Sequence, residues 1–219
     1  MAMVMGVIVL AACLHPAPKT GIRKDTRGDN VEAYIAQELD PAREDWQKPN
    51  QVIEALTIKK GATVADIGAG AGYFTWKLAE AVGPEGMVYA SDTNQELLTL
   101  LIKKATEGGF PSVKIIQAQP SDPQLPFDSV DLVLVCNNMS RVDYVYTFFD
   151  MLRRGIKTGG RLAIIDWDMK SEVGPDHVLR RKRQEVRRIV EGLGFRLVKD
   201  YDFLPHQYFM VFVLEERYG

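Results

Sequence analysis

The stretch Val64-Ala65-Asp66-Ile67-Gly68-Ala69-Gly70-Ala71-Gly72-Tyr73-Phe74 decides the fold of this chain. Its first four residues are typical of a short buried strand, and three glycines at every second position follow. Glycine lets a backbone turn tightly and approach a ligand closely. A helix predicted from Tyr73 to about Val82 points its N-terminus at the turn, which favours polar or negative ligand groups there. The pattern therefore predicts a nucleotide-type site rather than an ordinary connecting turn.

The spacing of this motif distinguishes two kinds of nucleotide site. A dinucleotide-binding motif needs its third glycine where this chain has Tyr73, because that glycine lets the helix and strand pack closely. One acidic residue, Asp66, stands before the glycines, and a second, Asp92, follows them. These residues resemble motif I of the class I S-adenosylmethionine-dependent methyltransferases. The resemblance extends from about Asp45 to Leu214 and implies S-adenosyl-L-methionine as the cofactor.

The resemblance also implies roles for individual residues. In that family the acid of the first strand, here Asp66, helps to orient the methionine end of the cofactor. The acid about 20 residues past the glycines, here Asp92, accepts hydrogen bonds from ribose hydroxyls. Asp92 could instead cap the next helix, although Thr93 or Asn94 could also do so. The expected cofactor-binding residues are Asp66, Gly68, Ala69, Gly70, Gly72, Tyr73, Asp92, Thr93, Ser121, Asp122 and Asn137.

Two of these assignments depend on segments further along the chain. In the family, the loop after the third strand contacts adenine, and Ser121 or Asp122 could do so here. Three prolines in that loop are equally consistent with a rigid turn. The apolar strand from Val130 to Cys136 should end at the ligand, because ligands bind at the carboxyl ends of such strands. Asn137, which follows it, could hold the cofactor's amino group or accept a hydrogen bond from a substrate.

The residues that perform the chemistry are not identified by the sequence. Amino-group methyltransferases often carry an Asn/Asp-Pro-Pro-aromatic run after the fourth strand, and this chain has none. In methyl transfer from a sulfonium the leaving group is neutral, so the protein mainly aligns the two reactants. The sequence does not identify the acceptor, which is a small molecule or another compound, and the catalytic residues stay unassigned. Two alternatives are a catalytically silent binding protein of this fold tethered to a membrane, and an NAD(P)-dependent oxidoreductase, which Tyr73 disfavours.

Composition sets the class of protein and its expected fold. The chain has 219 residues, of which 46% are hydrophobic and 26% charged, as in a globular domain. A net charge of −2 gives no signal for nucleic acid, and scattered histidines give no metal site. Strands alternating with helices from Thr63 to Ile165 predict a doubly wound α/β domain. The resemblance implies a Rossmann-like, mostly parallel sheet of seven strands with an antiparallel C-terminal hairpin, and we expect a monomer.

The N-terminal residues suggest a separate segment. Met1 to Ala12 are almost wholly apolar, and Leu10-Ala11-Ala12-Cys13 resembles the lipobox of bacterial lipoproteins. This resemblance implies a signal and linker over residues 1–30, a methyltransferase domain over residues 31–219, and a lipid on Cys13. The protein would then be a membrane-anchored lipoprotein facing the periplasm or cell exterior. A signal peptide should open with positive charge, but no Lys or Arg precedes Lys19, so a packed N-terminus in a cytoplasmic protein is the alternative.

Two other features of the sequence give specific expectations. Trp46 lies among charged residues and either pins the N-terminal segment onto the domain or forms part of a lid over the cofactor. Leu179 to Glu191 is predicted as one helix, with Leu179 toward the core. Arg180 should then lie on the opposite, basic face of this helix. Such a face is usually solvated but could also meet an anionic partner.

Overall fold

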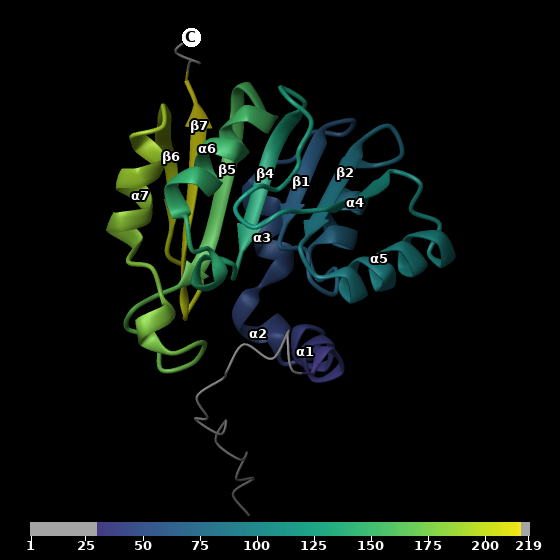
Figure 1. Cartoon of the computed structure of the whole chain (residues 1–219), viewed down its shortest axis with the longest axis horizontal. Helices are drawn as coiled ribbons and strands as arrows, with labels where there is room; N and C mark the ends of the chain where they lie inside the picture. The colour runs from purple at the N-terminus through teal and green to yellow at the C-terminus, as the bar shows by residue number, and fades with distance from the viewer. Residues whose placement is uncertain (1–29, 216–219) are drawn as a thin grey trace, which may run out of the picture.

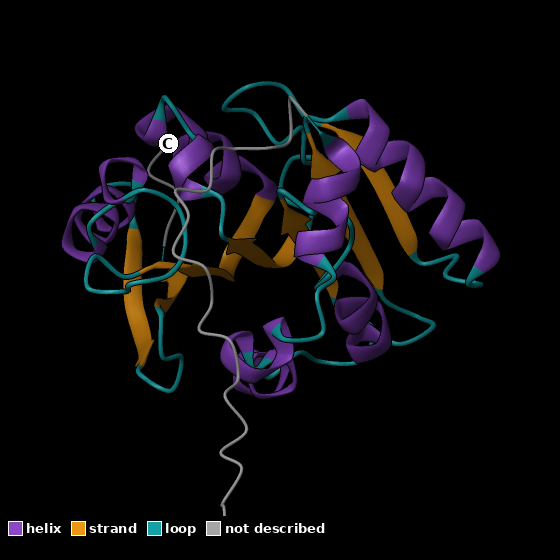
Figure 2. Ribbon diagram, turned by 90° about the horizontal axis from the view of Figure 1, so that it is seen from below, coloured by secondary structure: helices purple, strands orange, loops and turns teal. Residues whose placement is uncertain are grey.

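The computed structural model describes residues 30–215, and in this part of the chain seven strands form one sheet with helices on both faces (Figures 1 and 2). The strands are β1 Thr63–Ile67, β2 Met87–Asp92, β3 Val113–Gln117, β4 Val130–Cys136, β5 Ile156–Trp167, β6 Phe195–Tyr201 and β7 Gln207–Leu214. The helices are α1 Val31–Glu38, α2 Arg43–Gln47, α3 Pro49–Leu56, α4 Thr75–Val82, α5 Gln95–Glu107, α6 Val145–Gly155 and α7 Arg183–Glu191, with 3₁₀ turns η1 Met139–Arg141 and η2 His177–Leu179.

The sheet has the topology that the sequence predicts. Its strand order is β3-β2-β1-β4-β5-β7-β6, and β1 pairs in parallel with both β2 and β4. Strand β7 lies between β5 and β6 and is antiparallel to both, so the last two strands form an antiparallel pair. The order of the strands reverses at β1 and β4, and in such sheets a ligand crevice forms beyond the carboxyl ends at that point. This result confirms the predicted α/β fold with its C-terminal hairpin.

Two hydrophobic cores, one on each face, hold the sheet between its helices. On β7, Tyr208, Met210 and Phe212 pack with α6 and α7, while Phe209 and Val211 pack with α3 and α4. The strand is buried on both faces, which explains why its sequence is apolar without alternation.

The first two helices lie beyond the carboxyl ends of the central strands (Figure 1). Trp46 of α2 packs against Trp167 at the end of β5, with ring centroids 5.2 Å apart, and its ring lies 6.5 Å from that of His206. Trp46 therefore pins α2 onto the domain, which is one of the two roles expected for it. The same contact holds α1 and α2 over the edge of the sheet where the glycine turn lies.

The segment before α7 differs from the sequence prediction. The helix begins at Arg183, and Leu179, expected in the core, is 43% exposed. Arg180, expected on the solvated face, is only 7% exposed. Its guanidinium donates hydrogen bonds to the carbonyl oxygens of Asp168, Ser171, Val173 and Pro175. A buried cation that binds four carbonyls holds this stretch as a loop, and this outweighs its helical pattern.

Smaller differences occur at three other element boundaries. Helix α4 begins at Thr75 rather than Tyr73. The sequence predicts a helix from Val142 to Ile156, but α6 begins at Val145, after the separate 3₁₀ turn η1. The residues Lys157-Thr158-Gly159-Gly160 predict a turn, but strand β5 begins at Ile156 and includes them. The register between β4 and β5 shifts there, and Gly159 adopts a positive φ of 77°. A glycine tolerates this conformation, so the strand continues through an irregularity instead of ending at a turn.

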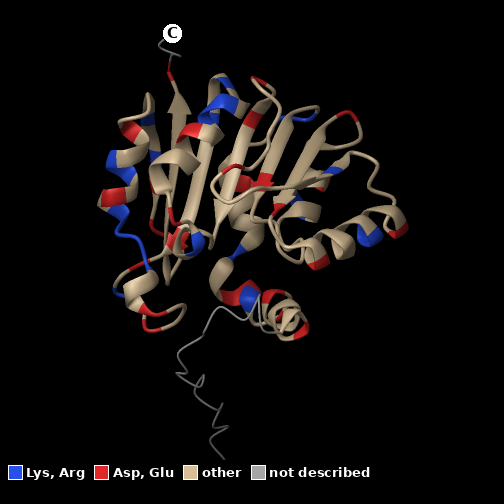
Figure 3. Cartoon of the chain, viewed as in Figure 1, with Lys and Arg blue, Asp and Glu red and all other residues tan. Residues whose placement is uncertain are grey.

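The basic face of α7 contains acidic residues as well (Figure 3). Arg187 pairs with Glu191 at 3.0 Å, and Arg183 pairs with Asp200 of β6. Charges of both signs on this face do not form a single-sign surface of the kind that attracts an anionic partner.

The buried guanidinium of Arg180 should be important for stability. Replacing Arg180 by Met keeps an unbranched chain but leaves several carbonyl groups without their donor. We expect the free energy of unfolding to fall by about 2–3 kcal/mol, measured by urea denaturation. Arg188→Met, at an exposed position of α7, is the matched control and should change stability by less than about 0.5 kcal/mol. Equal losses in the two variants would show that the loop does not depend on Arg180.

Candidate functional site

The glycine turn after β1 has a conformation that only glycine adopts readily. Gly68, Gly70 and Gly72 have φ angles of 71°, 57° and 88°. A Cβ atom on Gly70 would lie 2.8 Å from the Tyr34 hydroxyl and 3.2 Å from Glu38 Oε2, and one on Gly68 would lie 2.8 Å from the side chain of Asn138. The turn therefore needs glycine both for its backbone angles and for the close approach of neighbouring side chains.

Asp66 lies at the end of β1, below this turn, and its side chain is almost fully buried. It is 3% exposed and accepts a hydrogen bond of 2.7 Å from the Thr75 hydroxyl at the start of α4. Burial raises the pKa of the Asp66 carboxyl to about 6, although the hydrogen bond from Thr75 acts in the opposite direction. A buried carboxylate at the helix N-terminus is suited to hold a cationic group of a ligand.

The raised pKa of Asp66 gives a pH-dependent prediction. The folded protein holds this proton up to about pH 6, whereas the unfolded chain releases it near pH 3.8, so ionisation of Asp66 lowers stability as the pH rises between these values. Asp66→Asn removes this effect. Relative to the wild type, its free energy of unfolding should therefore increase by up to about 3 kcal/mol between pH 4 and pH 7. Urea denaturation across this range, with Asp202→Asn as an exposed control, measures it. A constant difference between variant and wild type would contradict the prediction.

Asp92 lies at the end of β2 and holds the glycine turn in place. It is 2% exposed, its Oδ2 accepts a hydrogen bond of 2.9 Å from the backbone N–H of Gly70, and its Oδ1 accepts one from Asn94 N. The N-cap of α5 is Asn94, whose side chain accepts from Glu96 N and Leu97 N. The alternative role of Asp92 as the helix cap is therefore wrong, and its carboxylate connects β2 to the turn.

A cavity of about 260 Å³ lies beside Asp92, and its size and lining suit the nucleoside part of a cofactor. Four predicted residues line it, namely Gly68, Asp92, Thr93 and Ser121. The other predicted residues, Asp66, Ala69, Gly70, Gly72, Tyr73, Asp122 and Asn137, do not line it. The list of expected cofactor-binding residues lacks several lining residues, among them Ile67, Ser91, Asn138, Arg141, Tyr144 and Phe148. Most of these follow β4, and the only signal for them was their position after a buried strand.

The loop after β3 forms a turn that borders the cavity. Ser121 has a positive φ of 63° and lines the cavity. The side chain of Asp122 instead accepts hydrogen bonds from the backbone and side-chain amides of Gln124. The backbones of Gln119 and Asp122 also bond to each other. In this structure Asp122 therefore stabilises the turn that presents Ser121 to the cavity.

Three amide side chains form a hydrogen-bonded group, here called the amide cluster, at the end of β4 and the start of β7. Two of them, Gln47 and Gln207, are buried, and Asn137 is half-buried. Gln47 donates to Gln207 at 2.6 Å, Gln207 donates to Asn137, and Asn137 donates to Gln47 at 3.2 Å. Asn137, expected to hold the cofactor's amino group or to bind a substrate, is thus held by partners distant in sequence. The cluster carries no charge and joins the N-terminal helices to the sheet.

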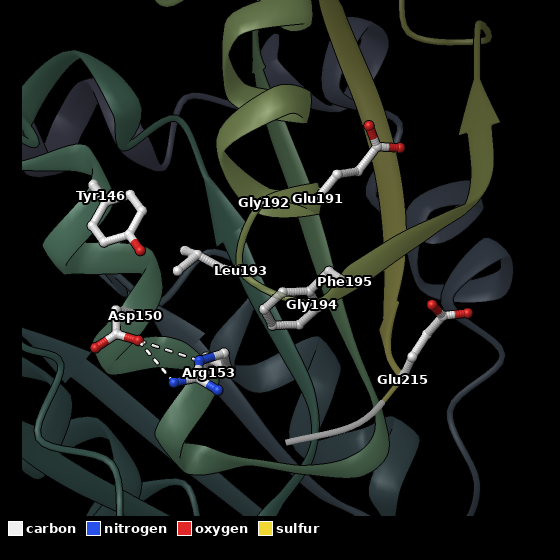
Figure 4. A pocket seen from close by; sticks show the side chains of 9 residues that line it. All are labelled: Tyr146, Asp150, Arg153, Glu191, Gly192, Leu193, Gly194, Phe195 and Glu215. Atoms are coloured by element: carbon white, nitrogen blue, oxygen red, sulfur yellow. Dashed lines mark hydrogen bonds and ion pairs between the residues drawn. The ribbon is translucent and has the colours of Figure 1, made fainter. Parts of the chain in front are cut away.

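Another hollow in the described residues lies outside this site. It is larger, about 820 Å³, and lies between α6, the turn after α7 and the start of β6 (Figure 4). Its lining includes Glu191 and Glu215, while Arg153 is bound to Asp150, and it contains no residue of the glycine turn. Among residues 30–215, no group of three or more His, Cys, Asp and Glu side chains could hold a metal ion. We therefore place the site at the carboxyl edge of the sheet.

The glycine turn, the placed acids and the seven-stranded sheet define a class I S-adenosylmethionine-dependent methyltransferase, with S-adenosylmethionine as its cofactor. The model of the ubiE/COQ5 methyltransferase family matches residues 41–178, more than half of the chain, and the chain belongs to that family.

Comparisons with individual proteins agree with this class. A SAM-dependent methyltransferase from Aquifex aeolicus has a similar structure, with a TM-score of 0.78 and 27% identity, covering 83% of this chain and 97% of that one. The demethylmenaquinone methyltransferase of Listeria monocytogenes serotype 4a is 27% identical over 160 residues, 73% of this chain and 66% of that protein. The one from Bacillus velezensis is 26% identical over 117 residues, 53% of this chain and 50% of that protein. The chain thus spans about half to two thirds of the length of these curated relatives.

Proposed function

We propose that the protein transfers the methyl group of S-adenosylmethionine to a planar, largely apolar small molecule bound beside His206. The arrangement of two hollows around the amide cluster supports this assignment. On one side, Asn138, next to Asn137, lines the nucleoside cavity. On the other, Gln207 lines a groove of about 610 Å³ with Asp168, Leu204 and His206. A cofactor whose nucleoside fills the cavity would direct its methyl group toward the cluster, and an acceptor in the groove could approach it there.

The main task of the protein in this reaction is to align the acceptor with the methyl group. S-adenosylmethionine supplies an activated methyl group, and the protein holds an acceptor in line with it and excludes water. An acceptor with an O–H or C–H group must also lose a proton. His206 and Asp168 line the groove and are the groups placed to receive it.

Aromatic side chains favour a flat acceptor. The rings of Trp46 and Trp167 pack at 5.2 Å, and His206 lies at the edge of this pair. Such surfaces bind planar rings well by stacking. The relatives named demethylmenaquinone methyltransferase also support a ring acceptor of the quinol type, which makes a naphthoquinol the first compound to test.

Turnover with a panel of acceptors tests this proposal. Full-length protein is incubated with S-adenosylmethionine and, separately, a 2-prenyl-1,4-naphthoquinol, a catechol, a primary amine and a thiol. We expect S-adenosylhomocysteine and a product heavier by one methylene group only with the naphthoquinol or the catechol. Asp92→Ala serves as the cofactor-site control. Methylation of the amine alone would contradict the acceptor class, and tight S-adenosylhomocysteine binding without turnover of any acceptor would support a catalytically silent protein.

We also propose that Cys13 is lipidated and attaches the protein to a membrane. Cys13 lies outside the described residues, and the support for this proposal is the lipobox-like run that ends there. Within residues 30–215 no helix combines the length and apolar character that a membrane crossing requires. Intact mass spectrometry of protein expressed in a bacterium should find a lipidated Cys13 at the start of the wild-type chain. The Cys13→Ser variant should remain an uncut precursor that keeps residues 1–12. Soluble protein with an unmodified start at Met1 would contradict this.

A further inference from the structure

The N-terminal helices place an ion pair between a buried and a partly buried residue over the glycine turn. Arg43 of α2 pairs with Glu38 of α1 through Nη1 and Oε2, which are 3.1 Å apart, and their side chains are 5% and 18% exposed. Arg43 also donates to the Gln47 side chain, and its guanidinium lies 3.8 Å from the centroid of the Tyr73 ring. A buried charged pair adds little to stability, because desolvating two charges offsets most of their attraction. Its position therefore needs another explanation.

The ion pair lies where the cofactor must extend beyond its nucleoside. The 260 Å³ cavity is lined by neither Asp66 nor Gly70, and by no residue of α1 or α2. Over Gly70, the space is taken by the Tyr34 hydroxyl and by Glu38 Oε2, which would lie 2.8 and 3.2 Å from a Cβ atom there. The methionine part of the cofactor, with one carboxylate and one ammonium group, has to fit between the cavity and these side chains.

We propose that Arg43 binds the methionine carboxylate of the cofactor, and that Glu38 takes the place of this carboxylate when no cofactor is bound. The proposal rests on the use of S-adenosylmethionine. One carboxylate replaces another on the same guanidinium, so Arg43 keeps a charged partner throughout. Asp66 remains available for the ammonium group. Glu38 is more exposed than Arg43 and can turn toward solvent as the cofactor enters.

This arrangement makes Glu38 a competitor of the cofactor. Binding must displace it from Arg43, so the apparent affinity falls with the fraction of molecules in which the internal pair is formed. A ligand that has the nucleoside but no carboxylate does not bind Arg43, so Glu38 would not compete with it. The two kinds of ligand therefore respond differently to changes at Arg43 and Glu38.

Calorimetric titration with two ligands tests the proposal on the full-length protein. S-adenosylhomocysteine carries the carboxylate, whereas 5′-methylthioadenosine lacks the whole aminocarboxylate group. We expect Arg43→Gln to lower the affinity for S-adenosylhomocysteine roughly 10- to 100-fold and to change the affinity for 5′-methylthioadenosine less than about twofold. Glu38→Gln should raise the affinity for S-adenosylhomocysteine several-fold and leave that for 5′-methylthioadenosine unchanged. Arg187→Gln, which breaks an ion pair on α7, is the control and should affect neither.

The outcomes separate this proposal from the cofactor assignment. Arg43 does not bind the carboxylate if Arg43→Gln lowers the affinity for both ligands equally or for neither. The same conclusion follows if Glu38→Gln lowers the affinity for S-adenosylhomocysteine. In these cases the cofactor assignment still stands. If the wild type binds neither ligand, the cofactor assignment fails and the proposal with it. Circular dichroism checks folding, and if Arg43→Gln does not fold, the Glu38→Gln result decides alone.

Discussion

Gly70→Val is expected to abolish binding of S-adenosylhomocysteine, with a loss of at least 100-fold in affinity. Gly70 has a φ of 57°, which a β-branched residue adopts only with strain. The new side chain would also collide with Tyr34 and Glu38, which lie against the turn. The turn and the N-terminal helices would have to move apart, and the N–H of Gly70 would leave Asp92. Calorimetric titration measures the loss.

Gly109→Val provides the matched control for this prediction. Gly109 has a similar φ of 68°, but a Cβ atom there would meet nothing within 4 Å. Gly109→Val therefore introduces the same kind of backbone strain as Gly70→Val, which costs about 1–3 kcal/mol of stability, but it causes no collision at the site. We expect Gly109→Val to lower the melting temperature and to keep its affinity for S-adenosylhomocysteine. Retained affinity in Gly70→Val would show that the turn is only structural.

Asp92→Ala should produce the second large loss of cofactor binding. Its carboxylate borders the nucleoside cavity and accepts the Gly70 N–H at 2.9 Å, so the substitution removes the expected ribose contact and loosens the turn together. The loss of a charged hydrogen-bond partner costs about 1.5–3 kcal/mol, or roughly 10- to 150-fold in affinity for S-adenosylhomocysteine.

Two further variants show whether the carboxylate of Asp92 itself is responsible. Asp92→Asn keeps the shape and one acceptor oxygen, so its affinity should fall between those of the wild type and Asp92→Ala. Asp143→Ala removes another acid at the same cavity, an exposed one with no assigned contact, and should change affinity less than about threefold. Equal losses in Asp92→Ala and Asp143→Ala would mean that only the overall charge of the cavity matters.

The parts of the site that are local in sequence could be predicted. The turn around Gly70 and the acid at Asp92 belong to a strand-turn-helix-strand unit, so residue type and spacing were enough to place them. The sheet followed in the same way, because a strand buried on both faces, such as Val130–Cys136, is recognised from its own composition.

The parts that depend on distant contacts could not be predicted. Arg43 and Gln47 belong to a charged segment whose sequence does not indicate burial. They are buried because α2 packs against strand ends about 90 to 160 residues away. The sequence predicts a cofactor contact for Asn137 and gives no sign that Gln47 and Gln207 hold it. Helical periodicity predicts a solvated position for Arg180, because it does not reveal the backbone carbonyls that surround this side chain.

Calorimetric titration of the wild-type, full-length protein with S-adenosylhomocysteine, and separately with NAD(P), tests the central claim most directly. The glycine turn, Asp66, Asp92 and the nucleoside cavity together predict one-to-one binding of S-adenosylhomocysteine and no heat of binding with NAD(P). No binding of S-adenosylhomocysteine by folded protein, or binding of NAD(P) in its place, would contradict the account.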